Sequence, residues 1–317
     1  MNIRQQRSHA RCRRGITHIE VLAMIGVLAV FSVLLPSAIL ASRETSRAKQ
    51  CQDRLRQIGK AFGAHHDTHG TLPPCRTKTP VDFGWCVNLL PYLGEERLHQ
   101  RFRFDRHFHA PENQEVVKTP LAIFQCPATP TQDRIMPIAL GSTDYGTQGI
   151  AGDYFVNHIL NPMYQVNGDR GHPVLLQEEF QPLSAVTDGL STTTIVMEQA
   201  GRPDHFVGRD KQANNSGLAA GPGWWGTWAS YQTFQLQSYA TDHISRGWDC
   251  SVNCNNSQGM YSFHQGGANV LFCDGHVRFL SDSIPGELVF ALASRNSQEI
   301  VGTEQWTVDP AKAGEPE

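Results

Sequence analysis

The C-terminal segment SFHQGGANVLFCDGHVRFLSDS, residues 262–283, carries side chains that could do chemistry: His264, Asp274 and His276. A histidine beside an aspartate suits a general acid–base pair or a divalent-cation site. No serine or cysteine in a recognisable nucleophile elbow accompanies them, and the pair Asp274-Gly275 is what a tight hairpin turn requires. We therefore expect a structural role, in which His264 hydrogen-bonds Asp274 or nearby backbone. A cation site and catalysis are the alternatives.

A second group of potential metal ligands lies in the segment HHDTH, at the end of a predicted helix. Imidazole and carboxylate groups can bind zinc or copper, but adjacent histidines on a helix diverge around its axis, and no four-ligand spacing is visible. We expect a solvated helix end and neither a metal nor another cofactor. The segment HHDTH contains His65, His66, Asp67 and His69. His107 and His109, in the segment RHFH, are possible further ligands.

The N-terminal region combines a basic leader with a long uncharged run. Five arginines and no acidic residue precede Gly15, and residues 21–42 carry no formal charge. A helix over these 22 residues would be about 33 Å long, enough to span a bilayer core of ~30 Å. The basic leader predicts a cytoplasmic N-terminus, a single pass through the inner membrane, and an exported C-terminal domain.

Glu20 is the single carboxylate at the start of this run. A charge at the edge of a membrane helix costs about 2–3 kcal/mol unless it is paired, so we expect it to be functional. The small residue Gly15 precedes the apolar run, whereas a secretory signal has its cleavage site after the run. The alternative is a plain signal anchor.

The spacing of Gly15, Ile16 and Glu20 resembles the processing site of type IV prepilins and pseudopilins. Ile16 stands where phenylalanine is usual, and His18 replaces an aliphatic residue. The resemblance implies cleavage after Gly15 by a prepilin peptidase, methylation of Ile16, and pairing of Glu20 with the amino terminus of a neighbouring subunit.

Most of the chain resembles a family of prepilin-type proteins of planctomycete-like bacteria, and the less typical region is about residues 201–259. The family's motif is a histidine, nine residues, then Asp-Gly, which here are His264, Asp274 and Gly275. Recurring blocks of the family are similar to residues 51–74, 85–102, 119–127 and 189–199. The resemblance implies a pilin-like or pseudopilin-like surface subunit whose C-terminal domain has no assigned function.

The cysteines predict disulfide bonds, because the exported compartment is oxidising. Cys12 is lost with the leader, and seven cysteines remain. Zinc ligation by the Cys-x3-Cys pair is the alternative, but no second close pair accompanies it. Cys273 is left over, and the expected pairs are Cys75 with Cys86, Cys250 with Cys254, and Cys51 with Cys126.

The elements that position these groups begin with one long helix. An apolar stripe at spacings of three and four continues after the membrane run through Cys51, Leu55, Ile58 and Phe62, which predicts an amphipathic helix that packs on a sheet. Pro36 should bend the helix or open its hydrogen bonding. The expected divisions are a leader (1–15), a transmembrane helix (16–42), its amphipathic continuation (43–64) and an exported globular domain (65–317).

Strand signals follow in the globular part. A β-branched run over residues 192–196 predicts a central strand, and residues 119–130, bounded by prolines, predict a short one. Residues around Asp274-Gly275 predict a hairpin with a two-residue type I′ turn, which would place Phe272 opposite Val277. The expected fold is therefore α+β, a long helix packed on an antiparallel sheet with long loops.

Composition limits the function. Removing the leader takes five of the 27 Lys and Arg and none of the 30 Asp and Glu, which leaves a net charge of about −8. This acidic balance argues against a nucleic-acid-binding face. Trp224, Trp225 and Trp228 form either a local core or a binding surface.

We expect a non-enzymatic, membrane-anchored prepilin-like subunit that associates with itself or with other pilin-like subunits, in a pilus or a type II secretion pseudopilus. Glu20 and Pro36 are the residues expected to matter for assembly. The alternative is a monomeric, membrane-anchored surface protein that binds a glycan or a cation.

Overall fold

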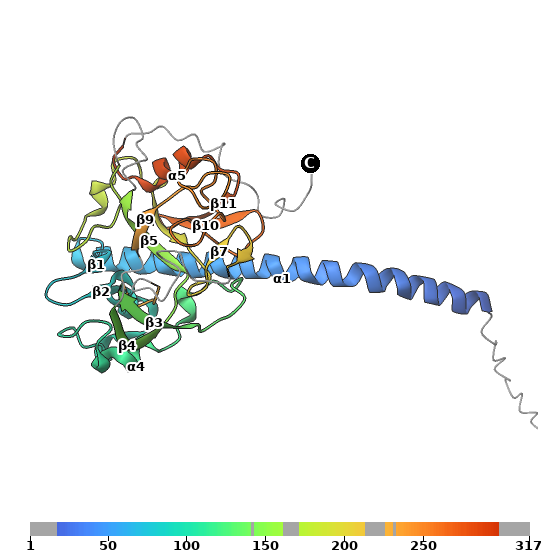
Figure 1. Ribbon diagram of the computed structural model, residues 1–317, viewed down its shortest axis with the longest axis horizontal. Helices are drawn as coiled ribbons and strands as arrows, with labels where there is room; N and C mark the ends of the chain where they lie inside the picture. The colour runs from blue at the N-terminus through green and yellow to red at the C-terminus, as the bar shows by residue number, and fades with distance from the viewer. Residues whose placement is uncertain (1–17, 141–142, 161–170, 213–225, 231–232, 298–317) are drawn as a thin grey trace, which may run out of the picture. The chain divides into compact units, whose positions relative to one another are not determined.

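A computed structural model describes residues 18–140, 143–160, 171–212, 226–230 and 233–297 (Figure 1). The chain divides into two compact units, residues 1–44 and 45–317. Helix α1 (His18–His69) begins in the first unit and ends in the second. Its residues 29–31, 33–38 and 41 are described by their backbone alone. Within the described residues, none of the helices contains an apolar window that meets the requirements of a membrane span.

The second unit contains four further α-helices and eleven strands among its described residues. The helices are α2 (Trp85–Leu89), α3 (Glu96–Arg101), α4 (Gln114–Val117) and α5 (Gly286–Ala293). The strands are β1 (Arg76–Thr77), β2 (Phe83–Gly84), β3 (Ile135–Leu140), β4 (Thr143–Ile150), β5 (Tyr154–Leu160), β6 (Thr194–Glu198), β7 (Phe206–Val207), β8 (Asp210–Lys211), β9 (Thr233–Leu236), β10 (Gly267–Phe272) and β11 (Val277–Ser281).

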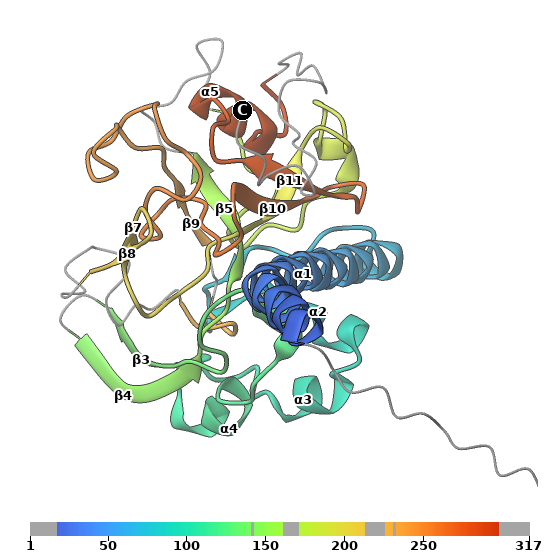
Figure 2. The ribbon, with the colours of Figure 1, turned by 90° about the vertical axis from the view of Figure 1, so that its right-hand side faces the viewer.

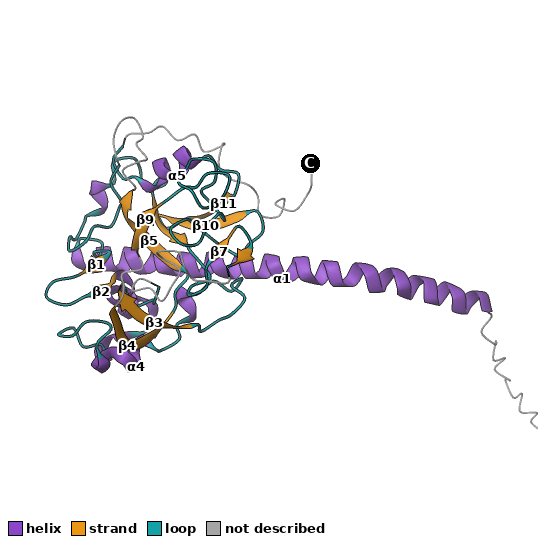
Figure 3. Cartoon of the chain, in the orientation of Figure 1, coloured by secondary structure: helices purple, strands orange, loops and turns teal. Residues whose placement is uncertain are grey.

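A five-stranded sheet with the order β11-β10-β6-β5-β9 forms one layer of this unit. Strands β5, β9, β10 and β11 of this sheet are labelled in Figure 3. Its neighbouring strands are antiparallel, except for the parallel edge pair β5 and β9. The central strand β6 overlaps the β-branched run that predicted a strand over residues 192–196. The α+β class and the packing of a long helix on an antiparallel sheet are confirmed.

The part of α1 in the second unit lies between two layers. The five-stranded sheet covers one side, and the short helices α2–α4 with β3 and β4 lie on the other (Figures 1 and 2). The predicted apolar stripe forms this contact, since Cys51, Leu55 and Ile58 are fully buried and Phe62 is nearly so. Burial of this stripe joins the helix to both layers.

Side-chain alternation divides the core at the sheet. Val196 and Leu271 face the core around α1, whereas Met197, Val270 and Phe272 face a second cluster that includes residues of α5. Successive residues of a strand point to opposite faces, so Val196 and Met197 of β6, like Leu271 and Val270 of β10, contact different cores. The sheet is therefore covered on both sides.

The hairpin register differs from the one predicted. Leu271, not Phe272, lies opposite Val277. The backbone N–H of Phe272 donates to the carbonyl of His276 at 2.9 Å, and Gly275 has a φ of 89°. This pattern is a three-residue turn with a left-handed glycine, which shifts the pairing by one position relative to a two-residue turn.

The segment 119–130 is not the strand that we predicted. It contains a 3-10 turn, η3 (Ala122–Phe124). Pro120 and Pro127 flank this turn, and neither can donate a backbone hydrogen bond to a strand ladder. The prolines therefore favour a turn over strand pairing.

Candidate metal centre

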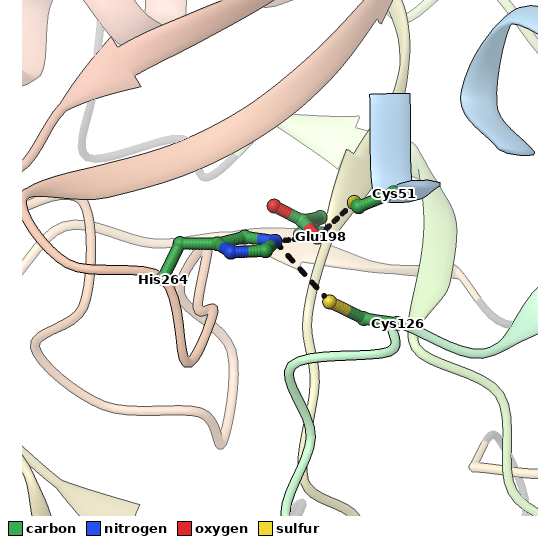
Figure 4. Close-up of side chains that lie close together, drawn as sticks. All are labelled: Cys51, Cys126, Glu198 and His264. Carbon is green, nitrogen blue, oxygen red and sulfur yellow. Dashed lines mark hydrogen bonds and ion pairs between the residues drawn. The ribbon is translucent and has the colours of Figure 1, made fainter. Parts of the chain in front are cut away.

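Four potential metal ligands lie together in the interior of the second unit: Cys51, Cys126, Glu198 and His264 (Figure 4). One ligand atom from each side chain lies within 4.8 Å of the other three. His264 is 1% exposed, and the other three are 0% exposed. In the described part of the chain, no other group of at least three His, Cys, Asp or Glu residues meets the same criterion.

Each side chain comes from a different element. Cys51 lies on the buried stripe of α1, and Cys126 follows η3. Glu198 is the last residue of β6 and, by strand alternation, shares the face of Val196, which packs around α1. His264 lies in the loop before β10. The fold therefore brings together residues that are more than 60 positions apart.

The contacts inside the cluster are short. The Cys51 thiol donates a hydrogen bond to Glu198 Oε1 at 2.7 Å. His264 Nε2 lies 3.4 Å from Cys126 Sγ and 3.6 Å from Glu198 Oε1. Two sulfur atoms, one imidazole nitrogen and one carboxylate oxygen thus face a common centre.

A second layer of polar groups orients these side chains. The backbone N–H of Asn269 donates to Glu198 Oε2 at 2.5 Å, which leaves Oε1 directed at Cys51 and His264. The Asn269 side-chain amide and the Tyr154 hydroxyl donate to Cys51 Sγ at 3.3 and 3.2 Å. Cys51 Sγ therefore accepts two hydrogen bonds from outside the cluster.

The loop that carries Cys126 is held by a buried carboxylate. Asp153 Oδ2 accepts the backbone N–H of Cys126 at 2.8 Å, and Oδ1 accepts that of Gly201 at 3.1 Å. Arg134 forms a buried ion pair with the same carboxylate. Asp153 thus connects the Cys126 loop to the segment that follows β6.

Burial and neighbouring groups shift the pKa values of the cluster. Burial raises the pKa of the Cys51 thiol and of the Tyr154 hydroxyl well above their ordinary values, and neighbouring groups, Glu198 among them, add to both shifts. Burial alone would raise the pKa of Glu198, but His264 and the hydrogen bonds from Cys51 and Asn269 together lower it. Glu198 is therefore a carboxylate in the folded protein.

The two ends of the histidine and Asp-Gly motif have different environments. His264 Nε2 contacts Cys126 and Glu198, whereas a hydrogen bond from His264 to Asp274 or to nearby backbone was expected. Asp274 instead accepts hydrogen bonds from the ring and the backbone N–H of His276, at 2.5 and 3.1 Å. The local pairing follows from the three-residue turn, which places these two residues next to each other.

The Asp-Gly turn packs against α1 through a second glycine. A Cβ atom placed on Gly59 would lie 2.9 Å from Leu271 Cδ1 and 3.3 Å from Gly275 Cα. Both glycines therefore allow a close approach between the helix and the turn. A cavity of about 360 Å³ lies beside this contact, with Phe62 and Leu183 among its lining residues.

The cysteines differ from expectation in two of three pairs. Cys250 and Cys254 form a disulfide, but the other two expected pairs, Cys75 with Cys86 and Cys51 with Cys126, are not disulfide-bonded. Antiparallel pairing of Arg76 with Gly84 places Cys75 opposite Trp85, one position before Cys86. Cys51 and Cys126 do lie close together, as their expected pairing required, but both face Glu198 and His264.

The other sequence candidates form no such centre. His65 is buried and its Nδ1 lies 2.8 Å from the carbonyl oxygen of Thr71, so this member of the HHDTH segment is not solvated as expected. Trp228 is buried, and its indole N–H donates to the carbonyl of Thr119 at 3.1 Å, as a local core requires.

Four further candidates lie outside the described residues: Gly15, Ile16, Trp224 and Trp225. Glu20 lies in the first turn of α1. The backbone of α1 is helical on both sides of Pro36.

The sequence alone does not predict that these four residues form one group. Cys51 and Cys126 were expected to form a disulfide, and His264 was expected to hydrogen-bond Asp274 or nearby backbone. Glu198 was given no role, and it lies two residues after the β-branched run 192–196. A carboxylate close to the end of a predicted central strand is the signal that could have indicated a site, since a buried carboxylate needs a partner.

One protein family matches most of the chain. The matched residues are 41–287, and the family is described as "Protein of unknown function (DUF1559)". No curated protein and no solved structure matches the chain. The matched part contains all four residues of the cluster and the histidine and Asp-Gly motif, whereas the leader and most of the uncharged run precede it. The chain therefore belongs to the DUF1559 family, whose function is unknown.

Proposed function

We propose that the protein is a membrane-anchored, prepilin-like structural subunit that is processed after Gly15 and assembles through α1. The observation that carries the proposal is the contrast between the two ends of this helix. In its first turns Ile19, Leu22 and Leu28 are 79%, 68% and 67% exposed, whereas Cys51 and Leu55 are fully buried. One end is an exposed apolar surface, and the other is part of a domain core.

An exposed apolar helix surface of this kind is typical of a segment that is covered by lipid or by other chains. The uncharged run of residues 21–42 extends this surface in the sequence. Anchoring in the cytoplasmic membrane, with the second unit exported, explains both features. The proposed partners are a prepilin peptidase and other copies of this or similar subunits.

In the proposed assembly, the apolar helices pack against each other and Glu20 sets their register. Glu20 is the acidic residue of the first turn of α1. A carboxylate in an apolar bundle favours arrangements in which a cation lies beside it, and the amino terminus released after Gly15 supplies such a cation. This role is structural and requires no catalytic activity.

The test is photo-crosslinking in cells that contain the protein's own export machinery. A photoreactive residue at Leu22 is expected to give a ladder of crosslinked multimers in the parent protein. Glu20→Ala should remove the ladder, and the matched control Glu44→Ala, on the same helix beyond the uncharged run, should retain it. A parent protein that gives only monomer would instead favour a monomeric surface protein. A ladder unchanged by Glu20→Ala would contradict the proposed role of Glu20 in assembly.

A further inference from the structure

We propose that Cys51, Cys126, Glu198 and His264 bind one zinc ion, which fastens α1 to the rest of the second unit. The set contains two thiols, one imidazole and one carboxylate, all of which are zinc ligands. All four are closed to solvent. This combination is typical of a structural zinc site, in which protein side chains supply every ligand.

The spacing of the four ligand atoms suits tetrahedral coordination. Zinc bonds of about 2.0–2.3 Å place tetrahedral ligand atoms about 3.3–3.8 Å apart. His264 Nε2 lies 3.4 Å from Cys126 Sγ and 3.6 Å from Glu198 Oε1. The separation of Cys51 Sγ from Glu198 Oε1 is shorter, 2.7 Å, because the thiol proton joins them. Replacing this proton with zinc requires these two side chains to separate by about 1 Å.

The hydrogen-bond donors around the cluster complement the negative charge of the zinc-bound site. Both thiols lose their protons to solvent as the two zinc–sulfur bonds form, so the site carries two thiolates, one carboxylate and Zn²⁺. Its net charge is then −1. Tyr154 and the side chain of Asn269 donate to Cys51 Sγ, and the backbone of Asn269 donates to Glu198. Donors of this kind orient metal ligands and stabilise their negative charge.

Two metal-free arrangements compete with zinc. In the first, the two thiols, Glu198 and His264 form a hydrogen-bonded network. In the second, Cys51 and Cys126 form a disulfide, which leaves Glu198 and His264 as a buried pair without a thiol partner. The contacts favour zinc because all four side chains direct a ligand atom to one centre, whereas a disulfide uses only two of them.

The bound zinc ion would stabilise the packing of α1 against its neighbours. Its ligands come from α1, the segment after η3, the end of β6 and the loop before β10. These elements belong to both layers that enclose α1 and to the helix itself (Figures 2 and 4). A single ion would therefore connect the helix to both layers, and it would do so whether or not the protein assembles through its N-terminal end.

The direct test is the metal content of the full-length protein, purified in detergent with zinc present and then desalted. Elemental analysis is expected to find about one zinc ion per chain. Cys126→Ala should reduce this content at least ten-fold. The control is Cys86→Ala, which removes an equally buried cysteine side chain outside the cluster and should retain the zinc.

Two further measurements test the inference even if the Cys126→Ala variant does not fold. Tyr154→Phe keeps the ring and removes one donor to Cys51, and it should weaken zinc binding by about 10–100-fold in a competition with a chelator. Adding Co²⁺ to the zinc-free parent protein should produce a thiolate-to-cobalt charge-transfer band. A parent protein without zinc and without this band would overturn the inference, as would a Cys51–Cys126 disulfide peptide or equal loss of zinc in Cys86→Ala.

Discussion

Replacing Gly59 with alanine tests the contact between α1 and the Asp274-Gly275 turn. The added Cβ would lie 2.9 Å from Leu271 Cδ1 and 3.3 Å from Gly275 Cα. The control is Gly63→Ala on the next turn of the same helix, where a Cβ meets no atom within 4 Å. The two substitutions make the same chemical change, and only the first crowds a neighbour.

The expected magnitudes follow from two opposing effects. Each substitution gains about 0.8–1.0 kcal/mol of helix propensity. Gly59→Ala must also displace Leu271 and the backbone of the turn, and overpacking of this kind costs about 1–3 kcal/mol. Gly63→Ala should therefore raise the free energy of unfolding by about 1 kcal/mol. The free energy of unfolding of Gly59→Ala should be lower than that of Gly63→Ala by about 1–3 kcal/mol.

Thermal unfolding of the full-length protein measures this difference. The near-ultraviolet circular dichroism of the buried Trp85 and Trp228 reports the loss of tertiary packing. At about 2–4 °C per kcal/mol for a domain of this size, the two variants should differ in Tm by about 2–12 °C. If Gly59→Ala stabilises the protein as much as Gly63→Ala does, the reasoning about a close helix–turn contact is wrong.

Three other predictions concern the second unit. Leu55→Ala, at a fully buried position of α1, should lower the free energy of unfolding by about 2–5 kcal/mol in urea denaturation; a loss below 1 kcal/mol would contradict the burial of this stripe. Cys254→Ala opens the short loop closed by the disulfide and should cost about 2 kcal/mol, and an unchanged Tm would show that this bond does not form. Burial lowers the pKa of His65, His99 and His109, so the unfolded chain takes up more protons, and stability should fall as the pH drops below about 7; a Tm that stays constant from pH 7.5 to 5 would refute this.

The fold was largely predictable because its main signals are local and periodic. The stripe through Cys51, Leu55 and Ile58 predicted which face of the helix is buried. The β-branched run predicted the central strand β6. The hairpin was predicted, but its register was wrong, because Asp-Gly is compatible with turns of two or three residues. The local sequence did not distinguish a two-residue turn from a three-residue turn.

The candidate metal centre was not predictable in the same way. Its ligands are separated by more than 60 residues at each step, and no short motif relates Cys51 to Cys126 or to Glu198. Their meeting depends on how α1 passes between the two layers, which is a tertiary property. The histidine and Asp-Gly motif was misleading for a physical reason: His264 belongs to the centre, and Asp274 belongs to the turn on α1.

The central claim, that the chain is a processed prepilin-like subunit, is tested most directly by mass spectrometry of its N-terminal peptide. The protein should be purified from membranes of cells that contain its prepilin peptidase. The account predicts a peptide that begins at Ile16 and carries an N-methyl group. A peptide that still begins at Met1, or one that begins after residue 40, would contradict it.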